Sequence, residues 1–304
     1  MSWLLITILA YFLLAISAEV DKFLLDKFLF NSRVYAFLIC ALSSVVLLAT
    51  PWFLSWPGWN GLILALLSGV AFCASLVFMF EALRRGEASR ITVIIGGFVA
   101  VFSVIFSYIF LQSNFSDKQW LGMSFMLGGI FLIATISSGK NKKLFLDKSA
   151  FYFSLLSGLL FALSFVGTKY IYSTQDPISG FIWIRIGALF LALLFLLRSK
   201  DRADILASFH AGPKTEKFSR RLLILGNQAI GSIAFVLQNY AIFLGPVAII
   251  NALQGVQYGF LLIFGWLLTI FRPGIIKEDI SRLIIIKKVL AIILISVGLY
   301  YIVL

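Results

Sequence analysis

The chain has 304 residues, of which 61% are hydrophobic and 12% are charged, and its mean hydropathy is +1.03. A soluble domain of this length cannot bury so much apolar surface, whereas recurring apolar runs of about 20 residues are typical of membrane-spanning helices. The net charge is +12. Because the basic residues stand in short connections between apolar runs, this charge favours a lipid bilayer and argues against a nucleic-acid partner.

Ten apolar segments are predicted to span the membrane: 3–25, 34–55, 60–82, 90–112, 119–138, 150–172, 178–198, 221–243, 247–271 and 284–303. The first segment has neither a basic leading region nor a small-residue cleavage site, so we expect an uncleaved span. Most connections are short. In the longer connection 199–220, residues 203–209 could form a short interfacial helix or remain a solvated loop.

The ten segments divide into two groups of five. Matched residues recur in both groups in the same order: Ala15, Ser17, Lys22 and Gly129 in the first, and Ala162, Ser164, Lys169 and Gly298 in the second. The hairpin 82–99 likewise matches 241–258. We therefore predict an all-α membrane protein built from two five-helix repeats, 1–138 and 149–304, joined by a basic linker at 139–148. Because five is odd, the second repeat must insert upside down relative to the first.

The basic residues are distributed as an inverted repeat requires. The odd-numbered connections and their flanks hold 22 of the 25 lysines and arginines, and the others are Lys118, Lys169 and Arg185. Positively charged connections stay in the cytoplasm. This bias predicts an inner (plasma) membrane protein with its odd connections in the cytoplasm and both termini outside.

Three stretches carry a family signature: FEALRRGEAS at 80–89, QNYAIFLGPVA at 238–248, and the glycine-rich GMSFMLGGIFLIA at 122–134. They resemble the drug/metabolite transporter (DMT) superfamily in its ten-span EamA-type form. The chain lacks two features common in that family, a helix-breaking proline in the fourth and ninth spans and a Leu-Gly-Glu after the fourth.

The resemblance implies a ten-helix basket around a substrate cavity. The cavity walls would come mainly from the first, third, fourth, sixth, eighth and ninth spans, and a small metabolite would move without ATP. The resemblance also implies cytoplasmic termini, opposite to the orientation that the charges predict, and we follow the charges.

Polar side chains form a stripe over about a third of the circumference of the ninth span: Asn251, Gln254, Gln257 and Tyr258. At the matched positions of the fourth span, Thr92 is followed by apolar residues. We favour a cavity wall that hydrogen-bonds a polar ligand. Amide contacts between helices, worth about 0.6–2 kcal/mol each, are the alternative. Gln238 and Asn239 in the eighth span extend the same prediction.

Arg185 lies inside the seventh span, where an unpaired arginine costs about 2.5–3.5 kcal/mol on insertion. It could clamp a carboxylate or phosphate bidentately. Because the seventh span is not a main cavity wall in the family, we favour a snorkelling or structurally paired arginine.

Four further charged residues are candidates for coupling or gating. Glu19 could carry a coupling proton, as a membrane carboxylate does in the small multidrug resistance relatives, but a salt bridge to Lys22 or to a basic connection is favoured. Glu81 ends the third span. Lys169 mirrors Lys22, and the two could form a gate pair or act as snorkelling anchors, which we favour.

These features predict a secondary active transporter, acting as an exporter, for a small polar metabolite such as an amino acid. A proton is the candidate coupling ion, and either a monomer or a homodimer would suit. Nucleotide-sugar or lipid-linked cargo is the alternative within transport, and an integral membrane enzyme or a channel is the alternative of another class. The sequence shows no phosphate-binding loop and no metal-ligand pattern, so neither a cofactor nor a metal is expected.

Overall fold

The computed structural model describes residues 2–28, 31–86, 88–112, 116–134, 147–210, 214–271 and 282–303, and the regular elements in these ranges are helices. The long helices are α1 (Ser2–Phe28), α4 (Gly58–Leu83), α5 (Ala88–Phe110), α6 (Asp117–Ala134), α7 (Lys148–Thr174), α8 (Pro177–Leu194), α10 (Lys214–Leu244), α12 (Gly255–Phe271) and α13 (Arg282–Val303). The shorter elements are α2 (Ser32–Ser43), η1 (Ser44–Ala49), α3 (Thr50–Phe53), η2 (Phe195–Leu197), α9 (Ser199–His210) and α11 (Val247–Ala252).

Eight helical stretches are long and apolar enough to cross a membrane: Trp3–Leu24, Ser32–Phe53, Gly58–Leu83, Arg90–Phe110, Lys148–Thr174, Pro177–Leu197, Leu222–Leu244 and Val247–Gly265. They coincide with eight of the ten predicted segments, and they confirm a multi-pass, all-α membrane protein. Helices α6 and α13 lie at the other two predicted segments but are not among these eight stretches. A count of ten spans therefore stays a prediction.

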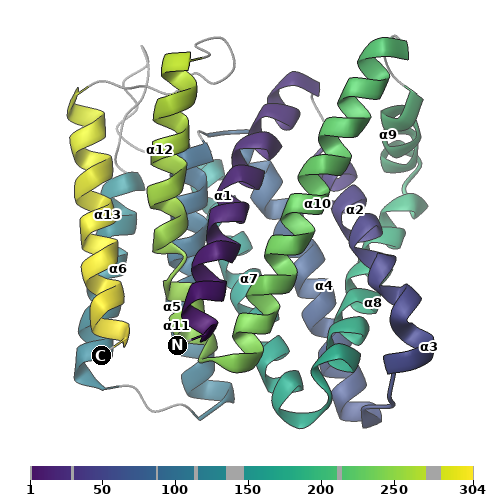
Figure 1. Cartoon of the computed structure of the whole chain (residues 1–304), viewed down its shortest axis with the longest axis horizontal. Coiled ribbons are helices and arrows are strands. Elements are labelled where there is room, and N and C mark those ends of the chain that lie inside the picture. Colours follow the sequence, from purple (N-terminus) through teal and green to yellow (C-terminus); the bar gives the residue numbers. More distant parts are fainter. Residues whose placement is uncertain are drawn as a thin grey trace.

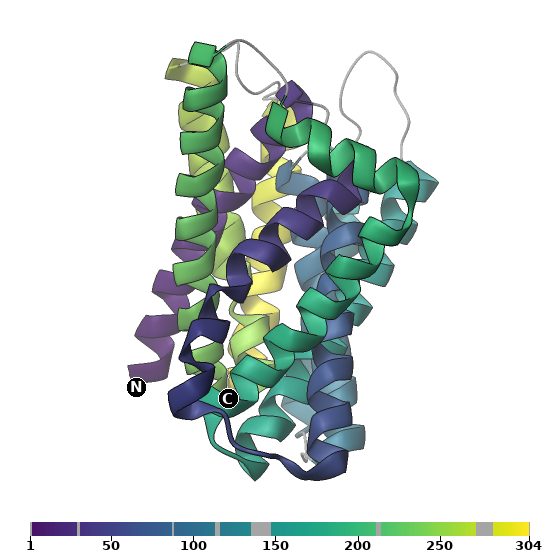
Figure 2. The same ribbon diagram turned by 90° about the vertical axis from the view of Figure 1, so that its right-hand side faces the viewer.

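The long helices stand side by side, and both ends of the chain lie at the same end of the bundle (Figure 1). Figure 2 shows α9 lying across the opposite end. The sequence left 203–209 open between a helix and a loop, and the structure makes it part of a helix. Arg33 and Asp201 form a salt bridge of 3.0 Å that ties α9 to the start of α2.

Helix α4 is wedged between α7 and α8, α1 packs along α10, and α6 packs along α13. Glycines allow α4 and α8 to touch backbone to backbone. A Cβ atom on Gly69 would lie 1.9 Å from the carbonyl oxygen of Ile184, and one on Gly187 would lie 2.3 Å from that of Leu66. This contact fixes the part of α8 that carries Arg185.

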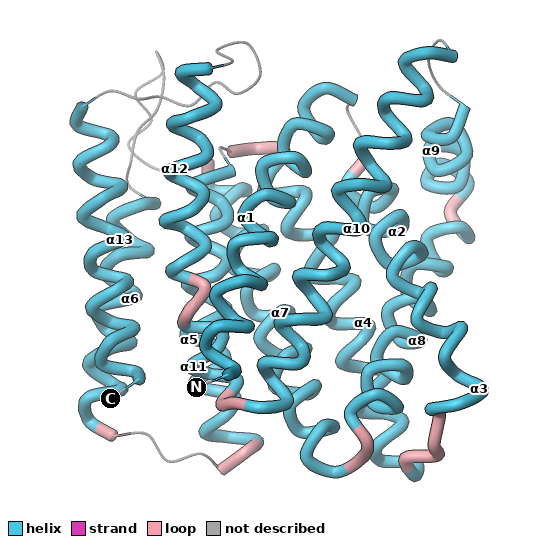
Figure 3. Tube along the Cα trace, in the orientation of Figure 1, coloured by secondary structure: helices cyan, strands magenta, loops and turns pink. Residues whose placement is uncertain are grey.

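The ninth span is two helices rather than the continuous helix that the sequence predicted. α11 ends at Ala252 and α12 starts at Gly255, with a short non-helical link between them (Figure 3). At the link, the Gln254 N–H donates to the Asn251 carbonyl, 3.2 Å away, in an i→i+3 bond. The Ile250 carbonyl instead accepts from the Tyr11 hydroxyl at 2.7 Å. Tyr11 therefore satisfies a backbone group that the break would leave unpaired inside the membrane.

Candidate substrate cavity

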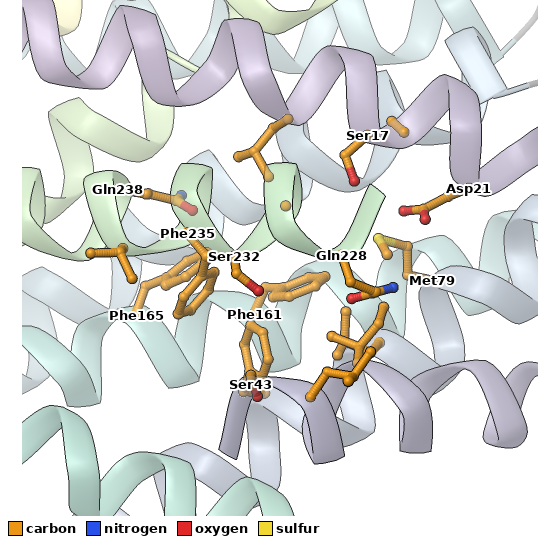
Figure 4. Close-up of a pocket in the computed structure, with 18 of the residues that line it drawn as sticks. Ser17, Asp21, Ser43, Met79, Phe161, Phe165, Gln228, Ser232, Phe235 and Gln238 are labelled. Carbon is orange, nitrogen blue, oxygen red and sulfur yellow. The ribbon is translucent and has the colours of Figure 1, made fainter. Parts of the chain in front are cut away.

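A cavity of about 350 Å³ lies among α1, α2, α4, α5, α7, α8 and α10 and the break between α11 and α12. Its charged lining residues are Asp21 and Arg185. Four amides line it, Gln228, Gln238, Gln254 and Gln257, together with the hydroxyls of Ser17, Ser43, Thr92 and Ser232. Figure 4 shows several of these polar side chains around a group of phenylalanine rings. The lining thus offers dispersed hydrogen-bonding groups on a largely apolar wall, as small-molecule sites do.

Five of the predicted binding residues line this cavity: Thr92, Arg185, Gln238, Gln254 and Gln257. Gln254 donates to the Gln257 side-chain oxygen at 3.2 Å, so the two amides form one polar strip beside the helix break. The walls also include α2 and α8, the second and seventh spans, which the family resemblance did not place there.

Three predicted binding residues lie outside the lining. Asn251 donates to Ser103 of α5 at 2.7 Å. Asn239 donates to the Phe235 carbonyl at 2.8 Å and accepts from Tyr172 at 3.1 Å. The Asn251–Ser103 and Tyr172–Asn239 bonds are contacts between helices, which formed the alternative interpretation.

Tyr258 is also buried and does not line the cavity. Its hydroxyl packs against Gly96 so closely that a Cβ on Gly96 would lie only 1.8 Å from it. The predicted stripe assumed a constant 100° per residue from Asn251 onward. The break after Ala252 changes the angular relation between α11 and α12. Asn251 and Tyr258 both point toward α5, at Ser103 and at Gly96, and so pack between helices instead of lining the cavity.

Asp21 is a cavity residue that the sequence analysis did not single out. It is 7% exposed, and its Oδ1 accepts from the Tyr35 hydroxyl at 2.5 Å and from Asn227 Nδ2 at 2.6 Å. Helical spacing could have identified it, because Ser17 and Asp21 are four residues apart and share one face of α1. Glu19, the predicted coupling carboxylate, is buried but is not in the cavity lining.

Arg185 is 2% exposed and is held by aromatic rings. Its Cζ lies 4.5 Å from the ring centre of Phe72, 4.9 Å from that of Phe181 and 4.2 Å from that of Phe235. Cation–π contacts of this kind are worth about 0.5–2 kcal/mol each. Among the described residues no carboxylate pairs with Arg185, and its structural partners are the three rings and the Ser43 hydroxyl. The choice between a structural and a ligand-binding arginine stays a prediction.

The two matched lysines bind helix ends. Lys22 Nζ donates to the Leu83 carbonyl at 2.8 Å, at the end of α4. Lys169 Nζ donates to the carbonyls of Ile242 and Gly245, each at 3.0 Å, at the end of α10. The last carbonyls of a helix lack partners and carry partial negative charge, so an ammonium group is stabilised there. Neither lysine lines the cavity, and a gating role stays a prediction.

Glu81 also acts at a helix end in the structure. It accepts from Ser32 at 2.6 Å, pairs with Arg84 at 3.5 Å, and forms a closer ion pair with Arg85. These contacts join the end of α4 to the start of α2 on the side opposite the termini. Glu81 is outside the cavity lining, so its proposed part in gating is also untested.

Comparison with known proteins identifies the family. The sequence profile of the EamA-like transporter family matches residues 1–135. A curated Sinorhizobium sp protein, described as an uncharacterized transporter in the cobO 3' region, is 32% identical over 99 residues, which are 32% of this chain and 69% of that protein. A solved structure described as "Crystal structure of protein" superposes with a TM-score of 0.57 at 15% identity, over 98% of this chain and 93% of the other, and it shows the fold alone. With its apolar helices, this chain therefore belongs to the EamA-like transporter family, and it is a membrane transporter of the DMT superfamily.

Proposed function

We propose that the protein is a secondary active transporter in the inner membrane that exports a small polar metabolite, such as an amino acid. The observation that carries this proposal is the cavity, which places a guanidinium, a carboxylate and several amides inside apolar spans. Polar groups at this depth are costly and mark substrate pathways. Arg185 and Asp21 form no ion pair with each other in the described structure, so neither charge neutralises the other.

Transport would proceed by alternating access between two inverted five-helix repeats in ten spans. The α6–α13 contact supports this arrangement. A Cβ on Gly129 would lie 2.8 Å from the Ala291 carbonyl, and one on Gly298 would lie 2.5 Å from the Gly122 carbonyl. The same offset in residue number relates Gly129 to Gly298 and Gly122 to Ala291, so it converts one contact into the other. The contact is therefore self-complementary, as a two-fold relation between repeats requires.

The lysine contacts support the same relation. Lys22 and Lys169 are matched positions. Lys22 binds a carbonyl at the end of α4, the third predicted span, and Lys169 binds carbonyls at the end of α10, which is the third span of the second predicted repeat. The comparisons add that the family profile stops at residue 135, close to the predicted end of the first repeat. The stretch shared with the Sinorhizobium protein is 32% of this chain but 69% of that protein, so the relative is less than half as long.

The orientation can be tested with single cysteines. Replacing the buried Cys40 and Cys73 by alanine gives a background for Lys200→Cys and Thr174→Cys, which are both exposed and lie on opposite sides of the bundle. If the odd connections are cytoplasmic, a membrane-impermeant maleimide added to intact cells labels position 174 and not position 200. Permeabilised cells, in which both must react, provide the control. The reverse pattern in intact cells would favour the orientation that the family resemblance implies.

Transport itself is tested by comparing the metabolites inside and outside cells with and without the protein. A solute that the protein depletes from cells is then measured in proteoliposomes at imposed pH gradients, with protein-free liposomes as the control. Export predicts a lower internal level of that solute and protein-dependent flux in vesicles. If no solute moves under any gradient, the proposal of secondary transport is wrong.

We propose a proton as the coupling ion and Asp21, rather than Glu19, as the group that exchanges it. Asp21 faces the cavity, where substrate and proton can compete for one carboxylate, whereas Glu19 does not. Because substrate and proton cannot both occupy this carboxylate, their competition links the substrate flux to the proton flux without direct contact between them. Nucleotide-sugar cargo is the weaker candidate, because Arg185 is the one basic side chain in the described lining and a diphosphate calls for a cluster.

A further inference from the structure

We infer that the substrate carries an anionic group, a carboxylate or a phosphate, that binds Arg185, and an apolar body that packs on the surrounding phenylalanines. This inference rests on the proposed transport function, whose cavity it would fill. It starts from how Arg185 is held, which the sequence alone did not reveal.

Three aromatic rings hold the Arg185 guanidinium in place and leave most of its N–H donors free to form hydrogen bonds. The rings come from three different helices, Phe72 from α4, Phe181 from α8 and Phe235 from α10, so the group is held in place from several sides. A guanidinium has five N–H donors. One nitrogen, Nη1, lies 3.5 Å from Ser43 Oγ, at the long limit of a hydrogen bond, and Nε and Nη2 have no hydrogen-bond partner. Donors on two edges of the planar group therefore remain unmatched.

A structural counter-ion for Arg185 is not found among the described residues. The carboxylate in the same cavity, Asp21, is bound by Tyr35 and Asn227 and does not reach Arg185. Lipid headgroups do not reach it either, because the side chain is 2% exposed and lies about two turns inside α8. A charge within the membrane is costly unless it has a partner, an anion would supply one, and the cavity that Arg185 lines is the route by which it can arrive. The fork-like guanidinium suits a carboxylate or phosphate in particular.

The walls next to Arg185 suit an apolar body. Phe161 stacks on Phe165 with ring centres 5.8 Å apart, and Phe72 meets Phe161 edge to face at 5.9 Å. Figure 4 shows Phe161, Phe165 and Phe235 grouped on the same side of the cavity as Ser43, the residue that Arg185 approaches. An organic anion could place its charged group on Arg185 while its hydrophobic part covers these rings.

The test measures binding to the purified full-length protein in detergent by titration calorimetry. Four probes share one aromatic body and differ in charge: phenylacetate, phenyl phosphate, 2-phenylethylamine and 2-phenylethanol. We expect at least one of the two anions to bind the wild type more tightly than the amine and the alcohol do. Arg185→Gln should weaken binding of that anion about ten- to hundredfold, the range for losing hydrogen bonds to a charged group. Arg185→Lys keeps the positive charge but not the bidentate guanidinium, so its affinity for the anion should lie between those of the wild type and Arg185→Gln.

Arg198→Gln is the matched control, because Arg198 is an exposed arginine just beyond the same span. It should bind the anion as the wild type does. All variants are first checked for a single symmetrical peak in size-exclusion chromatography, and Arg185→Lys keeps the test usable if Arg185→Gln does not fold. The inference is overturned if neither anion binds, if the amine or alcohol binds as tightly, or if the Arg185 variants bind the anion unchanged.

These outcomes are separate from the proposed function. Solute flux in vesicles without any effect of Arg185 on anion binding would leave the transporter proposal standing and remove this inference. Arg185-dependent anion binding without flux would do the opposite.

Discussion

Asp21→Asn is expected to abolish the response of transport to a pH gradient while leaving solute exchange across the membrane in place. Asparagine keeps the shape of the side chain, and its oxygen can still accept from Tyr35 and Asn227, which now bind the Asp21 carboxylate at 2.5 and 2.6 Å. It cannot gain or lose a proton. If Asp21 is the coupling group, the variant still binds solute in the cavity but has no proton to exchange for it.

The measurement uses proteoliposomes and the solute found by the metabolite comparison. A gradient of one pH unit provides about 1.4 kcal/mol per proton, which supports at most about tenfold accumulation in one-for-one exchange. The wild type should approach that ratio. The Asp21→Asn variant should equilibrate the solute and stop at a ratio near one, with or without the gradient.

Asp117→Asn provides the control, because Asp117 is an exposed carboxylate at the start of α6 and does not line the cavity. It should accumulate solute as the wild type does. If Asp21→Asn still accumulates solute under the gradient, coupling lies elsewhere, and Glu19→Gln becomes the variant to examine.

Gly69→Ala should strongly destabilise the protein. The added Cβ would stand 1.9 Å from the Ile184 carbonyl oxygen and 2.6 Å from the Ala188 nitrogen. Both are backbone atoms, so no side-chain rotation relieves the clash and the two helices must separate. Overpacking of this kind costs about 1–3 kcal/mol, and more where the backbone must move. Because Arg185 follows Ile184 directly, we also expect weaker binding of the anionic probe.

Thermal unfolding of purified protein in detergent measures the first effect. Gly128→Ala is the matched control, because no atom lies within 4 Å of a Cβ at that helical glycine. Alanine is preferred to glycine in helix interiors by roughly 0.5–1 kcal/mol, so the control should be unchanged or slightly more stable. Equal unfolding midpoints for the two variants would show that α4 and α8 do not meet as closely as described.

The sequence by itself determined the class of protein and the course of most of its spans. Hydropathy is a local property, so runs of about 20 apolar residues predict where helices lie whatever surrounds them. Eight of the predicted segments coincide with helices able to cross a membrane. Glutamines 254 and 257 could be placed in a cavity wall for a similar reason, since amides inside apolar spans must face polar surroundings or each other.

Only the tertiary structure decided which polar residues meet the cavity. At the break between α11 and α12, the Ile250 carbonyl accepts a hydrogen bond from Tyr11, which is 239 residues away in the chain. No proline marks the break, and the local signal is Gly255, with which α12 begins. Asn251 and Tyr258 face α5, whereas Gln254 and Gln257 line the cavity.

The charged residues show most clearly that the sequence alone does not decide which side chains face the cavity. Arg185 could be paired, snorkelling or ligand-binding until its neighbours were known, and those neighbours come from α4, α8 and α10. Asp21 and Glu19 are two residues apart, yet only Asp21 faces the cavity. The energy of a charge in a membrane depends on the groups within a few ångströms of it. Helices distant in the sequence supply those groups, so the packing of the bundle decides the role of each charge.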